Sequence, residues 1–327
     1  LVLPLGARGP LPIGAMLVLL SSAMRFHSKP ATDVVKRSTP RLLHKTKALV
    51  QELRQIEAKD IKKQLHVNDA LAKQYAQHLN QFEAKEPVPC AVLYDSPLYE
   101  ACSFGTMDEE DAEWANSYVR IFSGLYGFLR PFDDIQTLSL PVGLNTKLTN
   151  SKGQYLRNYW REHIDKEMED ALRNLPMPVV VNMASEEDKD FFSDEFLPAN
   201  TRVIKVDFKI SNKEDAGAAK GEFLRWMLEN RCMAVEELLE FKGLDEEAPD
   251  YRLSKKQPSS DTLLFEQNVG DGIDGGWSKK MKDYGGSKNK FIKEFASGAQ
   301  KYQRTEIKNA MKKETKANKK KGSSAFY

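Results

Sequence analysis

The chain has 327 residues, of which 41% are apolar, so it is long enough to bury a large hydrophobic core. Its net charge is only +2, but residues 268–327 hold fourteen lysines and one arginine against six acidic residues, a net of +9 that leaves about −7 on residues 1–267. The three cysteines are odd in number and lack the spacing of zinc ligands, which excludes a disulfide framework and indicates a reducing compartment such as the cytoplasm.

The first segment with a clear structural signal is the apolar run Met-Leu-Val-Leu-Leu at residues 16–20. It has the length and character of a buried strand. Residues 1–15 are rich in leucine, proline and glycine, and we interpret them as a leader or as a translation or annotation artefact ahead of Met16. No run approaches the ~20 apolar residues of a membrane span, so we expect a soluble protein with no membrane partner.

Helical periodicity recurs along the next two hundred residues. Asn68 can cap one helix, and Thr106 with Glu109 three residues later forms a capping box for another. The most regular pattern carries Trp160 on its apolar stripe. Helices are predicted at residues 42–56, 68–82, 106–119, 154–175, 223–228 and 236–241.

Apolar runs of strand length alternate with these helices. The predicted strands are residues 16–20, 90–94, 137–142, 178–182, 203–209 and 262–265. Alternation of the two patterns favours an α/β fold over separate helical and sheet domains. We predict a single large α/β domain over residues 16–267, with a mixed sheet of about six strands and surrounding helices, followed by a disordered basic tail at 268–327.

The stretch from Ser123 to Pro131 has the least ordinary local chemistry. Gly124 and Gly127 flank an apolar pair, which predicts a buried and sharply shaped turn. Arg120 and Arg130 stand on either side, so backbone N–H groups of the turn could cradle an anion between two cations. The simpler alternative is a packed turn with two solvated arginines.

Residues with catalytic chemistry are few. The sequence has no glycine-rich phosphate loop, no nucleophile elbow and no histidine pairing typical of a metal site, so we expect no cofactor and no metal. Ser185, followed by Glu186 and Glu187, comes after a predicted strand, where open α/β sheets collect ligands. Because no spacing nominates a histidine for Ser185, a helix cap is the simpler interpretation.

The basic tail differs in kind from the body. Glycines interrupt residues 270–286, and apolar residues after Lys288 could support a transient basic helix that ends in three lysines at 319–321. Such a segment is either a solvated tail or a nucleic-acid contact or import signal, which leaves a nuclear or organellar location open.

Several motifs together resemble the YaaA-type peroxide stress-response family, in the same order and at similar spacing. They cover about residues 16–267. These motifs are residues 16–21, 123–131, Tyr155 with Trp160, 182–187, and Ser259-Ser260 before 263–265.

The resemblance implies a single mixed α/β domain with a positively charged cleft. It also implies a cytosolic protein that is induced by hydrogen peroxide, lowers free intracellular iron, and binds DNA through a helix-hairpin-helix element. The turn at Gly124–Gly127 is similar to such a hairpin, whose backbone N–H groups hold a phosphate without reading bases.

The chain departs from the family pattern at several cations. Ser22-Ala23-Met24 stands where the family has Pro-Ala-Lys, Ser139 and Pro141 replace an arginine and a glutamate, and Asp188 and Asp190 replace an aromatic residue and a lysine. An Ala-Arg-Gly becomes Ala219-Lys220-Gly221. Because phosphate affinity depends on the number of neutralising cations, we expect a retained fold with a weakened anion site.

The leading hypothesis is a response to hydrogen peroxide through non-sequence-specific DNA binding in a basic cleft, without catalysis. The residues expected to bind nucleic acid are Arg120, Ser123, Gly124, Tyr126, Gly127, Arg130, Lys205, Lys220 and Arg225. One alternative is an enzyme that acts on a small anionic or nucleotide substrate through Ser185, Glu186 or Glu187. Another is an interaction module that has lost the cleft function and uses only its tail.

Overall fold

The computed structural model describes residues 16–268, apart from 32, 85, 139, 141–147, 151, 174, 176–177, 192–193, 212–214 and 246–249. All described residues belong to one compact unit, Leu1–Val269, and Gly270–Tyr327 form a second unit. The predicted leader lies outside the described residues, and so does the predicted basic tail apart from Asn268.

A seven-stranded sheet in the order β4-β3-β1-β6-β7-β9-β8 forms the centre of the fold. Its strands are β1 (Met16–Ser21), β3 (Val119–Ser123), β4 (Gly127–Leu129), β6 (Val179–Asn182), β7 (Arg202–Lys209), β8 (Tyr251–Leu253) and β9 (Thr262–Gln267). The five inner strands are parallel and the two edge strands are antiparallel. A separate pair joins β2 (Val88–Pro89) to β5 (Asp134–Ile135). This confirms a single α/β domain with a mixed sheet.

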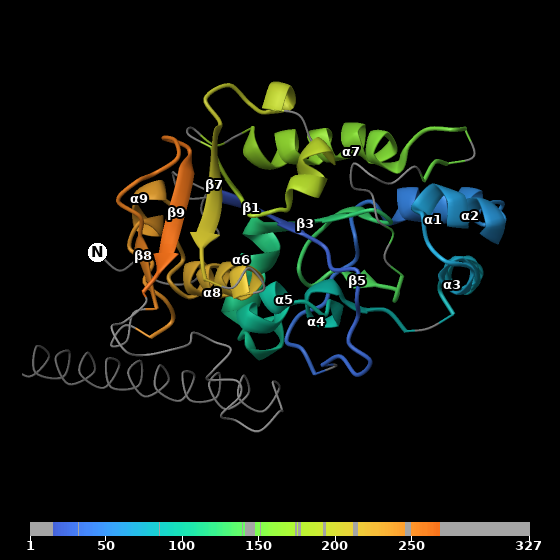
Figure 1. Ribbon diagram of the computed structural model, residues 1–327, viewed down its shortest axis with the longest axis horizontal. Helices are drawn as coiled ribbons and strands as arrows, with labels where there is room; N and C mark the ends of the chain where they lie inside the picture. The colour runs from blue at the N-terminus through green and yellow to red at the C-terminus, as the bar shows by residue number, and fades with distance from the viewer. Residues whose placement is uncertain are drawn as a thin grey trace, which may run out of the picture. The chain divides into compact units, whose positions relative to one another are not determined.

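Helices lie on both faces of this sheet, with α7 on one face and α5, α6 and α8 on the other (Figure 1). The helices are α1 (Leu43–Leu53), α2 (Ala58–Leu65), α3 (Asp69–Asn80), α4 (Cys90–Leu93), α5 (Pro97–Cys102), α6 (Glu109–Tyr118), α7 (Leu156–Leu172), α8 (Ala216–Glu229) and α9 (Val235–Leu238). Short 3-10 turns are η1 (Phe104–Thr106), η2 (Glu186–Phe191) and η3 (Asp194–Phe196). None of the helices in the described part of the chain is long and apolar enough to cross a lipid bilayer.

The sequence patterns of β1, β7 and α3 agree with the burial or the capping that the structure shows for these elements. The residues of β1 from Met16 to Leu20 are all buried, as expected of a strand covered on both faces. β7 alternates buried and partly exposed residues along its middle. The Asn68 side chain accepts a hydrogen bond from the backbone N–H of Leu71 at 2.9 Å, which confirms the predicted cap of α3.

Three predicted elements need correction. Residues 90–94 contain the helical turn α4 instead of a strand, because a five-residue apolar run is buried equally well in either conformation. The helix predicted from Thr106 begins at Glu109, where Asp108 caps it by accepting from the backbone N–H of Asp111. Residues 137, 138 and 140 of the third predicted strand are not in a strand, and the rest of it lies outside the described residues.

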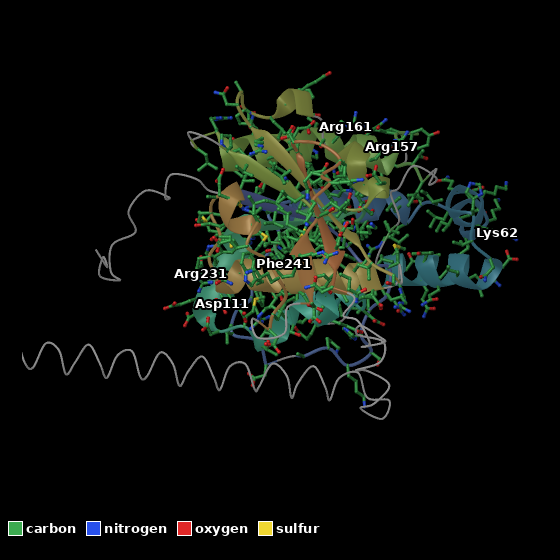
Figure 2. All side chains as sticks on the ribbon, turned by 60° about the vertical axis from the view of Figure 1, so that its left-hand side comes forward. Lys62, Asp111, Arg157, Arg161, Arg231 and Phe241 are labelled. Atoms are coloured by element: carbon green, nitrogen blue, oxygen red, sulfur yellow. The ribbon has the colours of Figure 1, made fainter. Side chains whose placement is uncertain are left out.

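An aromatic cluster fixes the last strands against α8. Phe241 packs edge-on against Phe223 with ring centroids 5.0 Å apart, and Phe208 stacks on Phe265 at 5.4 Å. Figure 2 shows Phe241 here, with Asp111 and Arg231 side by side nearby, joined by an ion pair of 2.6 Å. The sheet is thus anchored up to Gln267, the residue that ends β9 and precedes the lysine-rich segment.

Candidate functional site

The glycine turn is the connection of a β-hairpin between β3 and β4. Every residue from Ser123 to Leu129 is buried, and Gly127 has a positive φ of 72°. The indole N–H of Trp160, on α7, donates to the carbonyl of Gly124 at 2.8 Å. This confirms the predicted buried and shaped turn, but strands flank it where a helix-hairpin-helix element would have two helices.

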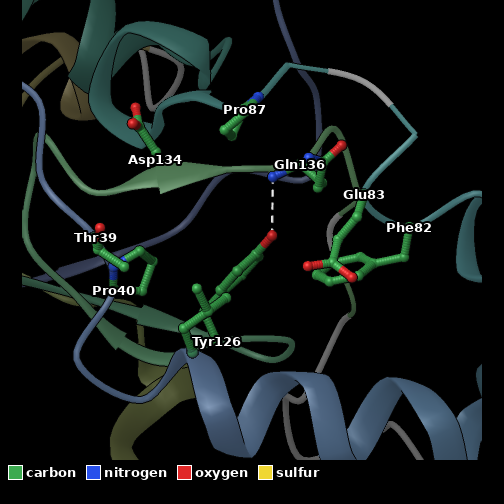
Figure 3. Close-up of a pocket in the computed structure, with 9 residues that line it drawn as sticks. Thr39, Pro40, Phe82, Glu83, Pro87, Tyr126, Asp134 and Gln136 are labelled. Atoms are coloured by element: carbon green, nitrogen blue, oxygen red, sulfur yellow. Dashed lines mark hydrogen bonds between the residues drawn. The ribbon is translucent and has the colours of Figure 1, made fainter.

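The polar groups of this turn bond within the protein. The Ser123 hydroxyl accepts from the backbone N–H of Tyr126 at 3.2 Å. The Tyr126 side chain lines a small cavity of about 170 Å³, where its hydroxyl accepts from the backbone N–H of Gln136 at 2.8 Å (Figure 3). The turn therefore does not present these groups to a DNA duplex.

Two of the predicted cations are held by carboxylates. Arg130 donates from Nε and Nη2 to the buried Asp133 at 3.0 and 2.7 Å. Arg225 is buried on α8 and donates from Nε to Glu229 at 2.7 Å and from Nη1 to Thr106 at 3.1 Å. Both guanidinium groups thus have their charge balanced inside the fold.

Arg120 is buried at the amino-terminal end of β3. Its Nη1 donates to the carbonyls of Asn116 and Val119, both at 2.8 Å. The side chain lines a cavity of about 430 Å³ that Arg130 and Arg41 also line. Burial lowers the pKa of Arg120 to about 10, and the positive charges of Arg41 and Arg130 add to this effect.

Lys205 and Lys220 lie at the opposite edge of the sheet, near the carboxyl ends of β1 and β6. The sheet order reverses between these two strands, which is where open α/β folds bind ligands. Lys205 pairs with Glu186 at 2.8 Å and with Asp207 at 3.3 Å. Lys220 donates to the carbonyl of Met183 at 3.2 Å, and burial lowers its pKa.

Ser185 lies at the same edge and is exposed. Its backbone N–H donates to the Ser21 hydroxyl at 2.8 Å, and its own hydroxyl donates to Asp188 at 3.4 Å. Glu187 belongs to η2, and its side chain lies outside the described residues. The pattern missed Ser21, although the end of the first strand is where a partner from a neighbouring parallel strand is expected.

The predicted site residues are therefore distributed over separate parts of the domain. Arg120 and Arg130 meet at the amino edge of the sheet, and Lys205, Lys220, Ser185 and Glu186 meet at the carboxyl edge. The hairpin residues are enclosed, and Arg225 packs against the segment around Cys102 to Thr106.

The structure also brings together three side chains of the kinds that bind metal ions, a grouping that the sequence did not suggest. Ligand atoms of His27, Asp95 and Glu100 lie within 4.8 Å of one another. An antiparallel β-bridge between Phe26 and Tyr94 brings together the two segments that carry His27 and Asp95. One imidazole and two carboxylates could hold a divalent cation such as Zn²⁺ or Mn²⁺. No sequence spacing could have indicated this set, because its members come from two distant segments.

All three cysteines of the chain are buried. Burial raises the pKa of the Cys232 thiol to about 12, and it also raises the pKa values of Cys90 and Cys102 well above that of a free thiol. The Cys90 thiol donates to the carbonyl of Arg130 at 3.2 Å. Since the thiolate is the species that reacts with peroxides and alkylating agents, these residues are inert in the folded protein.

We therefore expect the folded protein to resist thiol modification. Treatment with iodoacetamide or hydrogen peroxide at pH 8 should leave all three cysteines unmodified, whereas in denaturant iodoacetamide should alkylate all three and hydrogen peroxide should oxidise all three. Intact mass and peptide mapping measure both states. Stoichiometric modification of any one cysteine in the native state would contradict the burial described here.

Comparison with known proteins relates this chain to one protein family. A family model described as "Peroxide stress protein YaaA" matches residues 16–257, which is more than half of the chain. A UPF0246 protein of Maricaulis maris is 30% identical over 259 residues, which cover 76% of this chain and 95% of the relative. A UPF0246 protein of Caulobacter vibrioides is 30% identical over 244 residues, covering 70% and 91%. A UPF0246 protein of Bordetella petrii is 27% identical over 265 residues, covering 78% and 100%.

Proposed function

Because this chain belongs to the YaaA peroxide stress protein family, we propose that it acts in the response to hydrogen peroxide by binding DNA without reading its sequence. The lysine-rich segment 268–327 supplies most of the phosphate contacts. One observation carries this proposal: the chain concentrates fifteen cations against six acidic residues in that segment, while the preceding residues are net acidic. Lysines that contact phosphates as point charges give affinity without sequence selectivity.

The pairing of cations in the domain supports this division of roles. Arg130, Arg225 and Lys205 each lie within ion-pair distance of a carboxylate. A cation already neutralised by a neighbour displaces few counterions from DNA, so it adds little to affinity. Lys220 is partly buried and donates to a backbone carbonyl. The domain cations therefore play a secondary part.

The family description supports a role in the response to hydrogen peroxide. The buried cysteines limit how the protein could take part in that response. A protein without an accessible thiolate does not sense peroxide by cysteine oxidation. Protection through contact with DNA needs no such chemistry.

A survival experiment tests the proposal. A Caulobacter vibrioides strain that lacks its UPF0246 relative should become more sensitive to hydrogen peroxide, and expression of the full chain should restore survival. A chain that ends at residue 268 should restore little, because it lacks the lysine-rich segment. A matched chain with Lys205→Gln should restore survival like the full chain. Equal rescue by the truncated and full chains would contradict the role of the segment, and no rescue by either would contradict the proposed function.

A further inference from the structure

We infer that the cavity at the amino edge of the sheet, lined by Arg120, binds the oxyanion of a small molecule, a phosphate or a carboxylate. The cavity lies between the starts of β1 and β3 and the end of α7. Its volume of about 430 Å³ is that of a small-molecule site. This ligand is distinct from the DNA of the proposed function.

The two edges of the Arg120 guanidinium differ in their partners. Nη1 donates to the carbonyl of Asn116 in the last turn of α6 and to that of Val119, so this edge caps the helix. Among the residues that the structure describes, none accepts a hydrogen bond from Nε or Nη2. These two nitrogens form the edge that binds a carboxylate or phosphate in fork geometry. Arg130 uses the same two nitrogens for Asp133 in the same cavity wall.

The charges around the cavity are balanced except at Arg120. Lys36 pairs with Glu113, Arg41 pairs with Glu167 at 3.1 Å, and Arg130 pairs with Asp133 at 2.7 Å. Within the described ranges, Arg120 has no carboxylate at ion-pair distance. Among the described cations that line this cavity, only Arg120 lacks a paired carboxylate, so a bound anion would balance its charge.

Burial of a guanidinium beside two others is costly. The lowered pKa of Arg120 reflects the free-energy cost of keeping its charged form buried near Arg41 and Arg130. An anion in the cavity would reduce this cost. Leu172 and Leu175 form an apolar part of the wall, while Glu113 and Asp170 also line it. The wall thus fits a ligand with one oxyanion and a small apolar group, and the two carboxylates disfavour a polyphosphate.

Calorimetric titration of the full chain at constant ionic strength tests this inference, with inorganic phosphate and phenyl phosphate as probes. Phenyl phosphate should bind more tightly than phosphate because its ring reaches the apolar wall. Arg120→Gln should weaken both by about tenfold or more, the ratio expected when charge-assisted hydrogen bonds are lost. Arg54→Gln is the matched control, since Arg54 also donates to backbone carbonyls, those of Leu79 and Asn80, but lines neither this cavity nor the one in Figure 3.

A second variant keeps the test decisive if Arg120→Gln fails to fold. Ala171→Trp fills the cavity from α7 and leaves Arg120 in place, so it should also abolish binding of both probes. The lysine-rich segment is the same in every variant, so weak binding to it cancels in the comparison. No binding of either probe by the unaltered chain, or unchanged binding by Ala171→Trp, would overturn the inference.

Discussion

Replacement of Gly127 by alanine is expected to lower the free energy of unfolding by about 2–5 kcal/mol. Two physical effects act together. An L-residue at φ 72° costs about 1–2 kcal/mol, and overpacking of a core position costs about 1–3 kcal/mol. A Cβ at this position would lie 2.8 Å from Cδ2 of Trp160, well inside normal contact. Trp160 is fully buried and hydrogen-bonded to Gly124, so its ring has no room to move.

Gly153 provides the matched control. It has a nearly identical φ of 74°, but no atom lies within 4 Å of the place where a Cβ would stand. Gly153→Ala should therefore lower the free energy of unfolding only by the conformational cost, about 1–2 kcal/mol. Urea denaturation followed by tryptophan fluorescence measures both variants. Equal losses at the two positions would show that the contact between the hairpin and Trp160 is not what requires glycine at 127.

The close packing of Gly127 against Trp160 indicates that the glycine turn stabilises the fold. Gly127, with its positive φ and no Cβ, allows β4 to turn back on β3 beneath the Trp160 ring, and the backbone N–H of Tyr126 donates to the Ser123 hydroxyl within the hairpin. The same feature that marks the family in the sequence is thus explained by packing. Arg120, three residues before Ser123, has no carboxylate at ion-pair distance among the residues that the structure describes.

Local hydrophobic patterns were sufficient to predict most of the sheet. The runs at residues 16–20, 178–182, 203–209 and 262–265 coincide with strands, the first as a fully buried apolar run and 203–209 as an alternation of apolar and polar residues. β3 and β4 were not predicted as strands, since Arg120 and Gly127 interrupt their apolar pattern. Their strand conformation depends on pairing with β1 and with each other, which is a tertiary effect.

The candidate site was harder to predict than the fold. In the sequence the arginines look like available cations, but Asp133 lies three residues after Arg130, and Glu229 lies four residues after Arg225. Those short spacings were a usable signal that the charges are paired. The pairing of Arg41 with Glu167 has no such signal, because the two residues are brought together only by the packing of α7. Burial of Arg120 is likewise set by tertiary contacts.

Removal of residues 269–327 is expected to abolish DNA binding. Full-length protein should bind a mixed-sequence duplex and an unrelated duplex with equal affinity, and log K should fall linearly with log salt. If about 6–10 phosphates are contacted, affinity should drop by roughly 10³–10⁵ between 50 and 200 mM salt. The charge of the remaining chain is net negative, so its own cations cannot replace the segment.

The most direct measurement is this salt titration, carried out by fluorescence anisotropy on the full chain and on a chain ending at residue 268. Circular dichroism and the melting temperature should first show that the shorter chain is folded. A steep salt dependence is expected for the full chain, and at least a hundredfold weaker binding at 50 mM salt is expected for the shorter one. Equal affinity and equal slope for the two chains would contradict this expectation, since the phosphate contacts would then belong to the folded domain.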